Sequence, residues 1–199
     1  MHPNPGFAWK DEAAMRAFVS EAAFAHVVTV ADGRPASAQA PLAIAADGSV
    51  RFHLSRANKL VPLLDGAAVL ATVIGTHFYV SPDWYGTPDQ VPTWNYRMVE
   101  IEGVARRLDD MELRDLLDRL SETQEERLTP KPVWTSAKMD PAKLDAMARA
   151  IVGFAIEAPR FGGVLKMGQN KNDAEAAGAI GALRALGENR AADEMAGAR

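Results

Sequence analysis

The sequence predicts a mainly β protein with helices at its periphery, an α+β domain built on a small antiparallel β-barrel. Six to eight short segments rich in β-branched residues follow one another, separated by turn residues. About four further segments carry apolar residues at helical spacing outside these strands. At 199 residues and 48% hydrophobic composition, the chain can bury one core of ordinary size. Many antiparallel strands with few helices are typical of a closed or split barrel.

The first part of the chain predicts a helix followed by three strands in meander order. The helix is expected over residues 11–22, where apolar side chains recur at helical spacing and Asp11 can cap the start. The strands are expected at residues 26–30, 35–45 and 49–54. Asp32-Gly33 and Asp47-Gly48 join them, and both dipeptides are typical of hairpin turns.

The remainder alternates strands and helices without an interdomain linker. Further strands are expected at residues 68–74, 77–80, 93–108, 152–158 and 164–168. Helices are expected at residues 59–65, at 109–127, from 140 onward and at 173–186. Gly162-Gly163 predicts a turn between the last two strands. We therefore expect a single domain over residues 1–186, followed by a flexible tail over residues 187–199.

Composition narrows the possible function classes. No apolar run approaches the roughly 18 to 20 residues of a spanning helix, and the first residues lack the basic and apolar regions of an export signal. A cytoplasmic protein without membrane association is expected. The absence of cysteine excludes a disulfide scaffold, a thiolate nucleophile and a Cys-ligated metal. A net charge of −4 gives no global attraction to DNA, so DNA binding would need a local patch.

The common catalytic patterns are missing from the sequence. The four histidines do not have metal-ligand spacing, so no metal site is predicted. No G-x-S-x-G, P-loop or strand-to-helix G-x-G-x-x-G is present. Hydrolase, NTPase and Rossmann dinucleotide sites therefore lack support, and no catalytic residue is identified.

A candidate phosphate site follows the strand expected at residues 49–54. Arg56 and Lys59 supply cationic donors and Ser55 a neutral one, which is the mixture that a phosphate dianion needs. A helical turn begins just after them and adds its dipole. The alternative is an ordinary solvated connection after a strand.

A second candidate region is unusually aromatic. Five aromatic residues lie within the eighteen residues from Tyr79 to Tyr96, in a chain that is only 7% aromatic. One interpretation is a flat ligand gripped by the rings while Ser81, Thr93 and Asn95 hydrogen-bond its edge. The other is that the rings pack a core or a dimer interface.

A third candidate region comprises Gln169, Asn170 and Lys171. The two amides can donate and accept at once, as the uracil-like edge of a flavin requires. The alternative is an ordinary polar strand-to-helix loop with Asn172 or Asp173 as the N-cap.

Together these regions resemble a known family. The segments concerned are Ser-Arg-Ala-Asn at residues 55–58, Tyr-Val-Ser-Pro-Asp-Trp-Tyr at 79–85, Pro-Thr-Trp-Asn-Tyr at 92–96, and Ile-Val-Gly at 151–153 followed by Lys166 and Gln169-Asn170. Their order and spacing resemble the PaiB-like FMN-binding negative transcriptional regulators over residues 5–183. The resemblance implies an FMN-binding split barrel that forms a homodimer, with FMN in a groove between the subunits.

The resemblance also implies positions for the cofactor contacts. It places Ser55, Arg56 and Lys59 near the ribityl phosphate. It places Trp94, Asn95 and Tyr96 beside the flavin or holding its groove. Ser81 belongs to the same aromatic region, and Gln169, Asn170 and Lys171 approach from the last strand.

Three functions remain open from the sequence. The family label implies a negative transcriptional regulator that senses flavin or its redox state. An FMN-dependent oxidoreductase using NAD(P)H or another small redox partner is the alternative, because the flavin itself carries redox chemistry. Loss of flavin binding would leave an interaction module. No DNA recognition helix is evident, since the helix expected at residues 109–127 has more acidic than basic residues.

Overall fold

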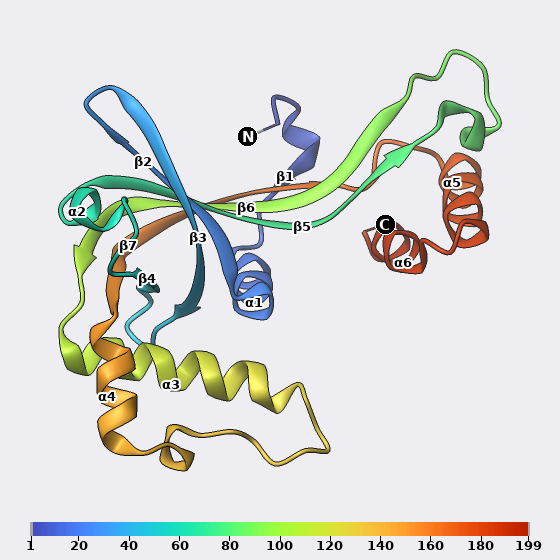
Figure 1. Ribbon diagram of the computed structural model, residues 1–199. Helices are drawn as coiled ribbons and strands as arrows, with labels where there is room; N and C mark the ends of the chain where they lie inside the picture. The colour runs from blue at the N-terminus through green and yellow to red at the C-terminus, as the bar shows by residue number, and fades with distance from the viewer. Residues whose placement is uncertain (1, 199) are drawn as a thin grey trace. The chain divides into compact units, whose positions relative to one another are not determined.

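The computed structural model describes residues 2–198 and contains one seven-stranded antiparallel sheet (Figure 1). Its order is β1-β7-β4-β3-β2-β5-β6, and an additional β6–β7 pairing closes the sheet into a barrel. The strands are β1 (Ala8–Trp9), β2 (Phe24–Ala31), β3 (Arg34–Ile44), β4 (Val50–Ser55), β5 (Ala68–Val80), β6 (Thr93–Arg107) and β7 (Ile151–Lys166). The expected antiparallel barrel is confirmed.

Helices connect and flank these strands. They are α1 (Glu12–Ala22), α2 (Val61–Leu64), α3 (Asp110–Glu126), α4 (Pro141–Arg149), α5 (Asp173–Ala185) and α6 (Asn189–Gly197), with short 3₁₀ turns η1 (Pro5–Phe7), η2 (Pro82–Tyr85) and η3 (Ser136–Lys138). Asp140 caps α4 and Asn172 caps α5, each by accepting a backbone N–H of the first turn, as N-cap residues do. No helix in the described residues is long and apolar enough to cross a membrane.

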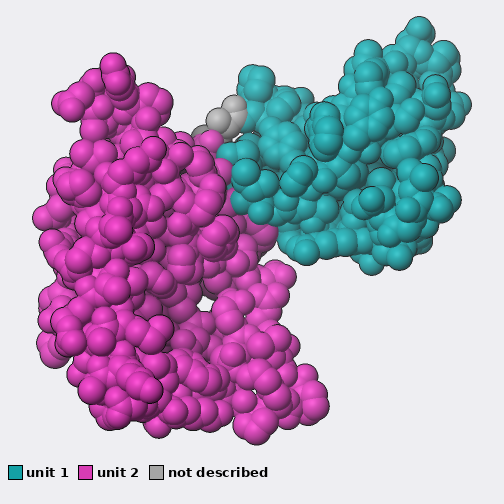
Figure 2. All heavy atoms as spheres, in the orientation of Figure 1, with its two compact units in different colours: residues 1–12, 74–99, 162–199 teal, residues 13–73, 100–161 magenta. Residues whose placement is uncertain are grey.

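The chain divides into two compact units, shown in different colours in Figure 2. Unit 1 comprises residues 1–12, 74–99 and 162–199, and unit 2 comprises residues 13–73 and 100–161. Three of the four boundaries of unit 2 fall inside the strands β5, β6 and β7, and the fourth falls at the start of α1. Each unit is described separately below, and the single domain expected over residues 1–186 stays a prediction.

The core of unit 2 lies between the strands and α3. Phe52 of β4 and Phe154 of β7 are fully buried, and their rings stack with centroids 5.6 Å apart. Leu113 and Leu116 of α3 pack on the sheet, which explains the apolar stripe of this helix.

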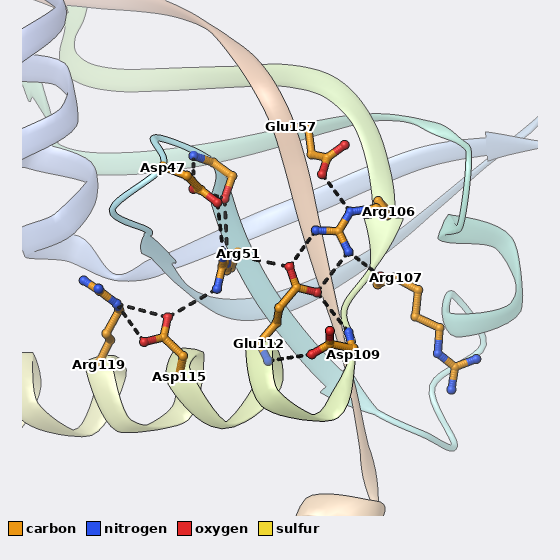
Figure 3. A network of polar contacts seen from close by, with 10 residues as sticks. Asp47, Arg51, Arg106, Arg107, Asp109, Glu112, Asp115, Arg119 and Glu157 are labelled. Atoms are coloured by element: carbon orange, nitrogen blue, oxygen red, sulfur yellow. Dashed lines mark hydrogen bonds and ion pairs between the residues drawn. The ribbon is translucent and has the colours of Figure 1, made fainter.

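A polar network fixes the first turn of α3 in unit 2 (Figure 3). The Arg106 guanidinium donates to Glu112 at 2.7 Å and to Glu157 at 2.7 Å. The hydrogen bond from Arg106 lowers the pKa of the Glu112 carboxyl to about 2. Arg51 of β4 donates to Asp47 at 3.0 Å and lies 4.0 Å from Glu112. The start of α3 is therefore tied by charge to two strands, β4 and β6, and Arg106 of β6 also pairs with Glu157 of β7.

The core of unit 1 lies among η2, α5 and α6. Tyr85, Leu183 and Met195 are among its buried members, and small residues fill the space between the two helices. A Cβ on Gly178 of α5 would lie only 2.2 Å from the backbone oxygen of Trp84. Only glycine allows this approach of α5 to η2.

Two predicted breaks between strands are wrong. Residues 68–80 form one strand, β5, and residues 151–166 form one strand, β7. Gly162-Gly163 does not turn the chain, because Gly163 pairs with Trp9 of β1 and neither glycine has a positive φ. The predicted turn at Asp32-Gly33 is confirmed, with φ of 51° and 71°.

Residues 189–197 are a helix, α6, where a flexible tail is the sequence expectation. Ala191, Ala192 and Met195 of α6 are buried. Glu194 also accepts a hydrogen bond from Thr76 of β5 at 2.6 Å and lies 3.1 Å from Arg97 of β6. Packing and an ion pair therefore order this segment, although its alanines give a weak hydrophobic signal.

Candidate functional site

The candidate phosphate residues lie at the end of β4 and on the turn before α2. Ser55, Arg56 and Lys59 are all exposed. The backbone N–H of Asn58 donates to the Ser55 carbonyl at 2.8 Å, and the Asn58 side chain accepts from the Leu60 N–H at 2.9 Å. These bonds fix a tight turn that carries two cations and a hydroxyl at the surface of unit 2.

The Arg56 side chain also holds the end of α4. Its Nε donates to the Arg149 carbonyl at 2.7 Å, and its Nη2 donates to the Ile151 carbonyl at 3.2 Å. The backbone N–H of Arg56 donates to the Ala150 carbonyl at 2.8 Å. A guanidinium carries five N–H donors, so these two side-chain bonds leave capacity for a phosphate oxygen.

Three exposed rings gather on β5 and β6 of unit 1. The Trp94 side chain is 56% exposed and Tyr79 is 45% exposed. The ring centroids of Trp94 and Tyr79 are 6.2 Å apart, and those of Trp94 and His77 are 6.3 Å apart. Exposed aromatic rings in contact form a surface on which a flat ring can stack. His77 was not a sequence candidate, although its place two residues before Tyr79 puts it on the same face of β5.

The other aromatic residues of this region pack a core. Tyr85 is 4% exposed within the unit 1 core, and Trp84 packs against the same cluster. The two interpretations of the aromatic region therefore apply to different residues. Trp84 and Tyr85 are structural, whereas Trp94 is available to a ligand.

Trp94, Asn95 and Tyr96 do not share one surface. Successive side chains of a strand point to opposite faces, and Asn95 is 1% exposed while Trp94 is mostly exposed. The buried Asn95 Nδ2 makes no hydrogen bond within residues 2–198, and a Cβ on Gly168 would lie 3.7 Å from it. Asn95 therefore lies beneath the β7–α5 connection, whereas Trp94 and the half-buried Tyr96 lie on the opposite face of β6.

Lys166 at the end of β7 adds a cation to unit 1. Its Nζ donates to Thr93 Oγ1 at the start of β6 and lies 5.8 Å from the centroid of the Phe7 ring. Burial lowers the pKa of the Lys166 ammonium. Lys166 is part of the family-like motif, and the structure shows that it holds Thr93 next to the exposed Trp94.

The last candidate residues form the connection from β7 to α5. The Gln169 amide is engaged at both ends, accepting from the Met167 N–H at 2.8 Å and donating to the Leu165 carbonyl at 2.5 Å. Asn170 is exposed. The Lys171 ammonium donates to the Gln90 side chain and lies 4.2 Å from the Tyr85 ring centroid. Of these side chains, Asn170 alone is fully at the surface.

The segment between η2 and β6 is anchored on α5. Glu175 accepts from Thr87 Oγ1 at 2.9 Å and from Gln90 Nε2 at 3.1 Å. The bond from Thr87 lowers the pKa of the Glu175 carboxyl, so it remains ionised at neutral pH. Ser81 caps η2 by accepting from the Asp83 N–H at 3.4 Å. Ser81, Gln90 and Glu175 thus position the chain that leads into Trp94.

Each unit exposes a set of side chains with a ligand chemistry of its own. In unit 2, two exposed cations and a hydroxyl have the donor chemistry of a phosphate site. In unit 1, the exposed rings offer a stacking surface for a flat aromatic group. Asn95 is buried, and the Gln169 amide is hydrogen-bonded to backbone groups. These two side chains are therefore not part of the exposed surface.

Two solved structures with a similar fold are named as flavin-containing proteins. The flavocytochrome Anf3 from Azotobacter vinelandii has a TM-score of 0.60 and 19% identity, covering 89% of this chain and 78% of that one. The FAD- and haem-binding protein from Mycobacterium smegmatis has a TM-score of 0.58 and 17% identity, covering 85% of this chain and 78% of that one. These similarities establish the fold class, an α+β split barrel.

Sequence comparison identifies the family. Residues 1–160 match the family described as "Putative FMN-binding domain". The protease synthase and sporulation protein PAI 2 of Bacillus subtilis (strain 168) is 31% identical over 183 residues, covering 90% of this chain and 86% of that protein. The chain therefore belongs to the PaiB-like FMN-binding family, and its cofactor is FMN.

Proposed function

We propose that this chain is an FMN-binding negative transcriptional regulator that works as a homodimer. The observation that carries the proposal is the 31% identity to a protein named for protease synthesis and sporulation, over 90% of the chain. These are processes that a cell controls through gene expression, which favours a regulatory role for the relative. The dimer follows from the family resemblance.

The chain's own residues have distinct roles in this proposal. Arg56 and Lys59 bind the FMN phosphate as cations, and the Ser55 hydroxyl adds a neutral donor. Trp94, with Tyr79 beside it, binds the flavin ring by stacking. Lys166 keeps Thr93 and the start of β6 in position. When bound, FMN supplies one- and two-electron redox chemistry.

An FMN-dependent oxidoreductase is the second candidate, and the charges of α3 favour it. This helix carries seven acidic and two basic side chains, which is a poor surface for duplex DNA. The exposed Trp94 and Tyr79 would in turn leave one side of a stacked flavin open to a small redox partner. NAD(P)H is the partner class expected.

FMN retention tests the cofactor contacts directly. Wild type and an Arg56→Ala, Lys59→Ala variant are incubated with FMN and desalted, and their absorbance spectra are recorded. We expect the variant to bind FMN on the order of 100-fold more weakly, because two charge-assisted phosphate contacts are lost. An Arg34→Ala, Lys143→Ala variant removes two exposed cations elsewhere and should retain wild-type colour. Equal retention in all three proteins contradicts the phosphate assignment.

A second pair of measurements separates the two functions. Salt-sensitive retention of the FMN-loaded protein on promoter DNA supports regulation. Bleaching of the bound flavin by NAD(P)H without oxygen, and its return with an electron acceptor, supports the oxidoreductase. DNA binding without turnover rules out the second candidate, and turnover without DNA binding rules out the first.

A further inference from the structure

Unit 2 contains a cavity that the FMN contacts do not explain. Its volume is ≈ 650 Å³, within the range of about 300 to 1,000 Å³ that is typical of small-molecule sites. It lies between α3, the segment containing η3, α4 and the start of β7. None of the candidate flavin-ring residues of unit 1 lines it.

The helix α4 supplies one wall of this cavity and buries no residue. Leu144 and Ala148 are half-buried, and Met147 is 63% exposed. These side chains line the cavity together with Trp134 and Leu117 of α3. Helices in proteins owe most of their stability to packing of their apolar face. The apolar face of α4 therefore borders an open volume that an apolar molecule would fill.

The wall of the cavity carries a cation beside its apolar side chains. Arg114 and Asp145 form an ion pair at 2.6 Å and neutralise each other. The other charged side chains in the wall are Arg56, Arg107, Arg149, Asp110 and Asp118. Because Arg56 is assigned to the FMN phosphate, two guanidinium groups, those of Arg107 and Arg149, and two carboxylates remain in the wall. Arg149 directly follows Ala148 in the chain, and both line the cavity, so a cation borders the apolar wall.

His53 provides a further polar group in the wall. Its Nδ1 is buried and makes no hydrogen bond with any described residue. Burial lowers the pKa of the His53 imidazole, which is therefore neutral at pH 7. A buried polar atom without a partner is costly, so His53 Nδ1 marks a weakly satisfied position in the wall, although the atom itself is not exposed to the cavity.

We propose that this cavity binds a small aromatic or aliphatic molecule carrying a single anionic group, such as a carboxylate or sulfonate. The apolar body lies against Leu144, Ala148 and Trp134, and the anionic group lies toward Arg149. The site is separate from that of FMN, because Arg56 is the only proposed FMN contact in its wall and the anionic group is assigned to Arg149 instead.

Binding of two matched probes to the FMN-loaded full chain tests this proposal. Anilinonaphthalene sulfonate is an apolar anion, and N-phenylnaphthylamine has the same rings without the charge. Equilibrium dialysis measures both without interference from flavin colour. We expect saturable binding of the sulfonate at one probe per chain, about tenfold tighter than the neutral probe. Equal affinity for both probes overturns the anion preference, and displacement of the sulfonate by excess FMN overturns the separation of the sites.

Two variants locate the probe. Ala148→Phe fills the cavity and should weaken sulfonate binding at least about tenfold, while Ala146→Phe, on the exposed side of the same helix, should leave it unchanged. Arg149→Gln should reduce the preference for the charged probe, and Lys143→Gln should preserve it. FMN retention and far-UV circular dichroism confirm that each variant is folded. Binding that survives Ala148→Phe, or that is lost equally in Ala146→Phe, places the probe elsewhere and refutes the proposal.

Discussion

The two units carry helical layers that differ in packing. In unit 1, α5 and α6 bury small side chains, including Ala179 and Ala192, and α5 approaches η2 so closely that Gly178 has no room for a Cβ. In unit 2, α4 carries larger apolar side chains, Leu144 and Met147, yet buries none of its residues. The size of the apolar side chains on a helix therefore does not show how deeply it packs. Small residues permit close approach, and larger ones can border a cavity.

The largest expected effect comes from removing a large side chain from the closely packed layer. Met195→Ala in α6 should lower the free energy of unfolding by about 2 to 5 kcal/mol, since Met195 is completely buried. Met147→Ala in α4 should change it by less than about 0.5 kcal/mol, because Met147 is 63% exposed. Urea unfolding followed by circular dichroism measures both. Similar losses of unfolding free energy in the two variants would show that α6 and α4 do not differ in packing.

Adding a methyl group tests the same contrast in the opposite direction. Gly178→Ala should cost about 1 to 3 kcal/mol, because the new Cβ would lie 2.2 Å from the Trp84 backbone oxygen, which must shift. Gly181→Ala is the matched control on the same helix. Apart from its chain neighbours and the nearby backbone of α5 itself, no described atom lies within 4 Å of its added Cβ, so it should stabilise the protein by about 0.5 to 1 kcal/mol. The midpoint temperature of thermal unfolding should fall for Gly178→Ala and rise for Gly181→Ala.

The smallest effect concerns the charged network that holds α3 in unit 2. In the folded protein the pKa of Glu112 is lowered from 4.5 to about 2 by Arg106, so its contribution is complete above pH 4.5 and is lost as the pH falls toward 2. Arg106 is 41% exposed, so solvent screening reduces this contribution to about 1 kcal/mol.

Glu112→Gln should therefore lose about 1 kcal/mol of stability at pH 7 and show a weaker decline of stability between pH 4.5 and 2. Unfolding midpoints measured across this pH range test it. Glu122→Gln, on the exposed side of the same helix, should follow the wild-type curve. If both variants lose stability between pH 4.5 and 2 as the wild type does, the contact between Arg106 and Glu112 contributes nothing measurable to the free energy of unfolding.

Much of the fold could be predicted because local signals were strong. Asp32-Gly33 specified the β2–β3 turn, and Asp140 with Pro141 specified the start of α4. Gly162-Gly163 misled, since two glycines suggest a turn while pairing of Gly163 with Trp9 of β1 keeps the strand extended. That pairing joins residues more than 150 positions apart and leaves no local signal. The order of residues 189–197 likewise depends on contacts that Met195 and Glu194 make with distant elements.

The candidate site was predictable in composition and less so in arrangement. The basic turn at Ser55, Arg56 and Lys59 is exposed at the end of a strand as expected. The motif Trp94-Asn95-Tyr96 suggested three contacts to one ligand, but strand alternation separates Asn95 from its neighbours. The double engagement of the Gln169 amide by backbone groups could not be inferred from residue type.

The division of β5, β6 and β7 between the units affects the order in which the chain folds during synthesis. Every segment of unit 2 has been made once residue 161 is complete, whereas the unit 1 core requires residues of α6. Tyr85 and Met195 belong to the same core and are 110 positions apart (195 − 85). Ribosomes add about 5 to 20 residues per second. Roughly 5 to 20 seconds therefore pass between synthesis of the apolar side chains of η2 and synthesis of their packing partners in α6. All segments of unit 2 are thus present while the core of unit 1 is still incomplete. Chaperone binding to the exposed apolar side chains of η2 is expected during that interval.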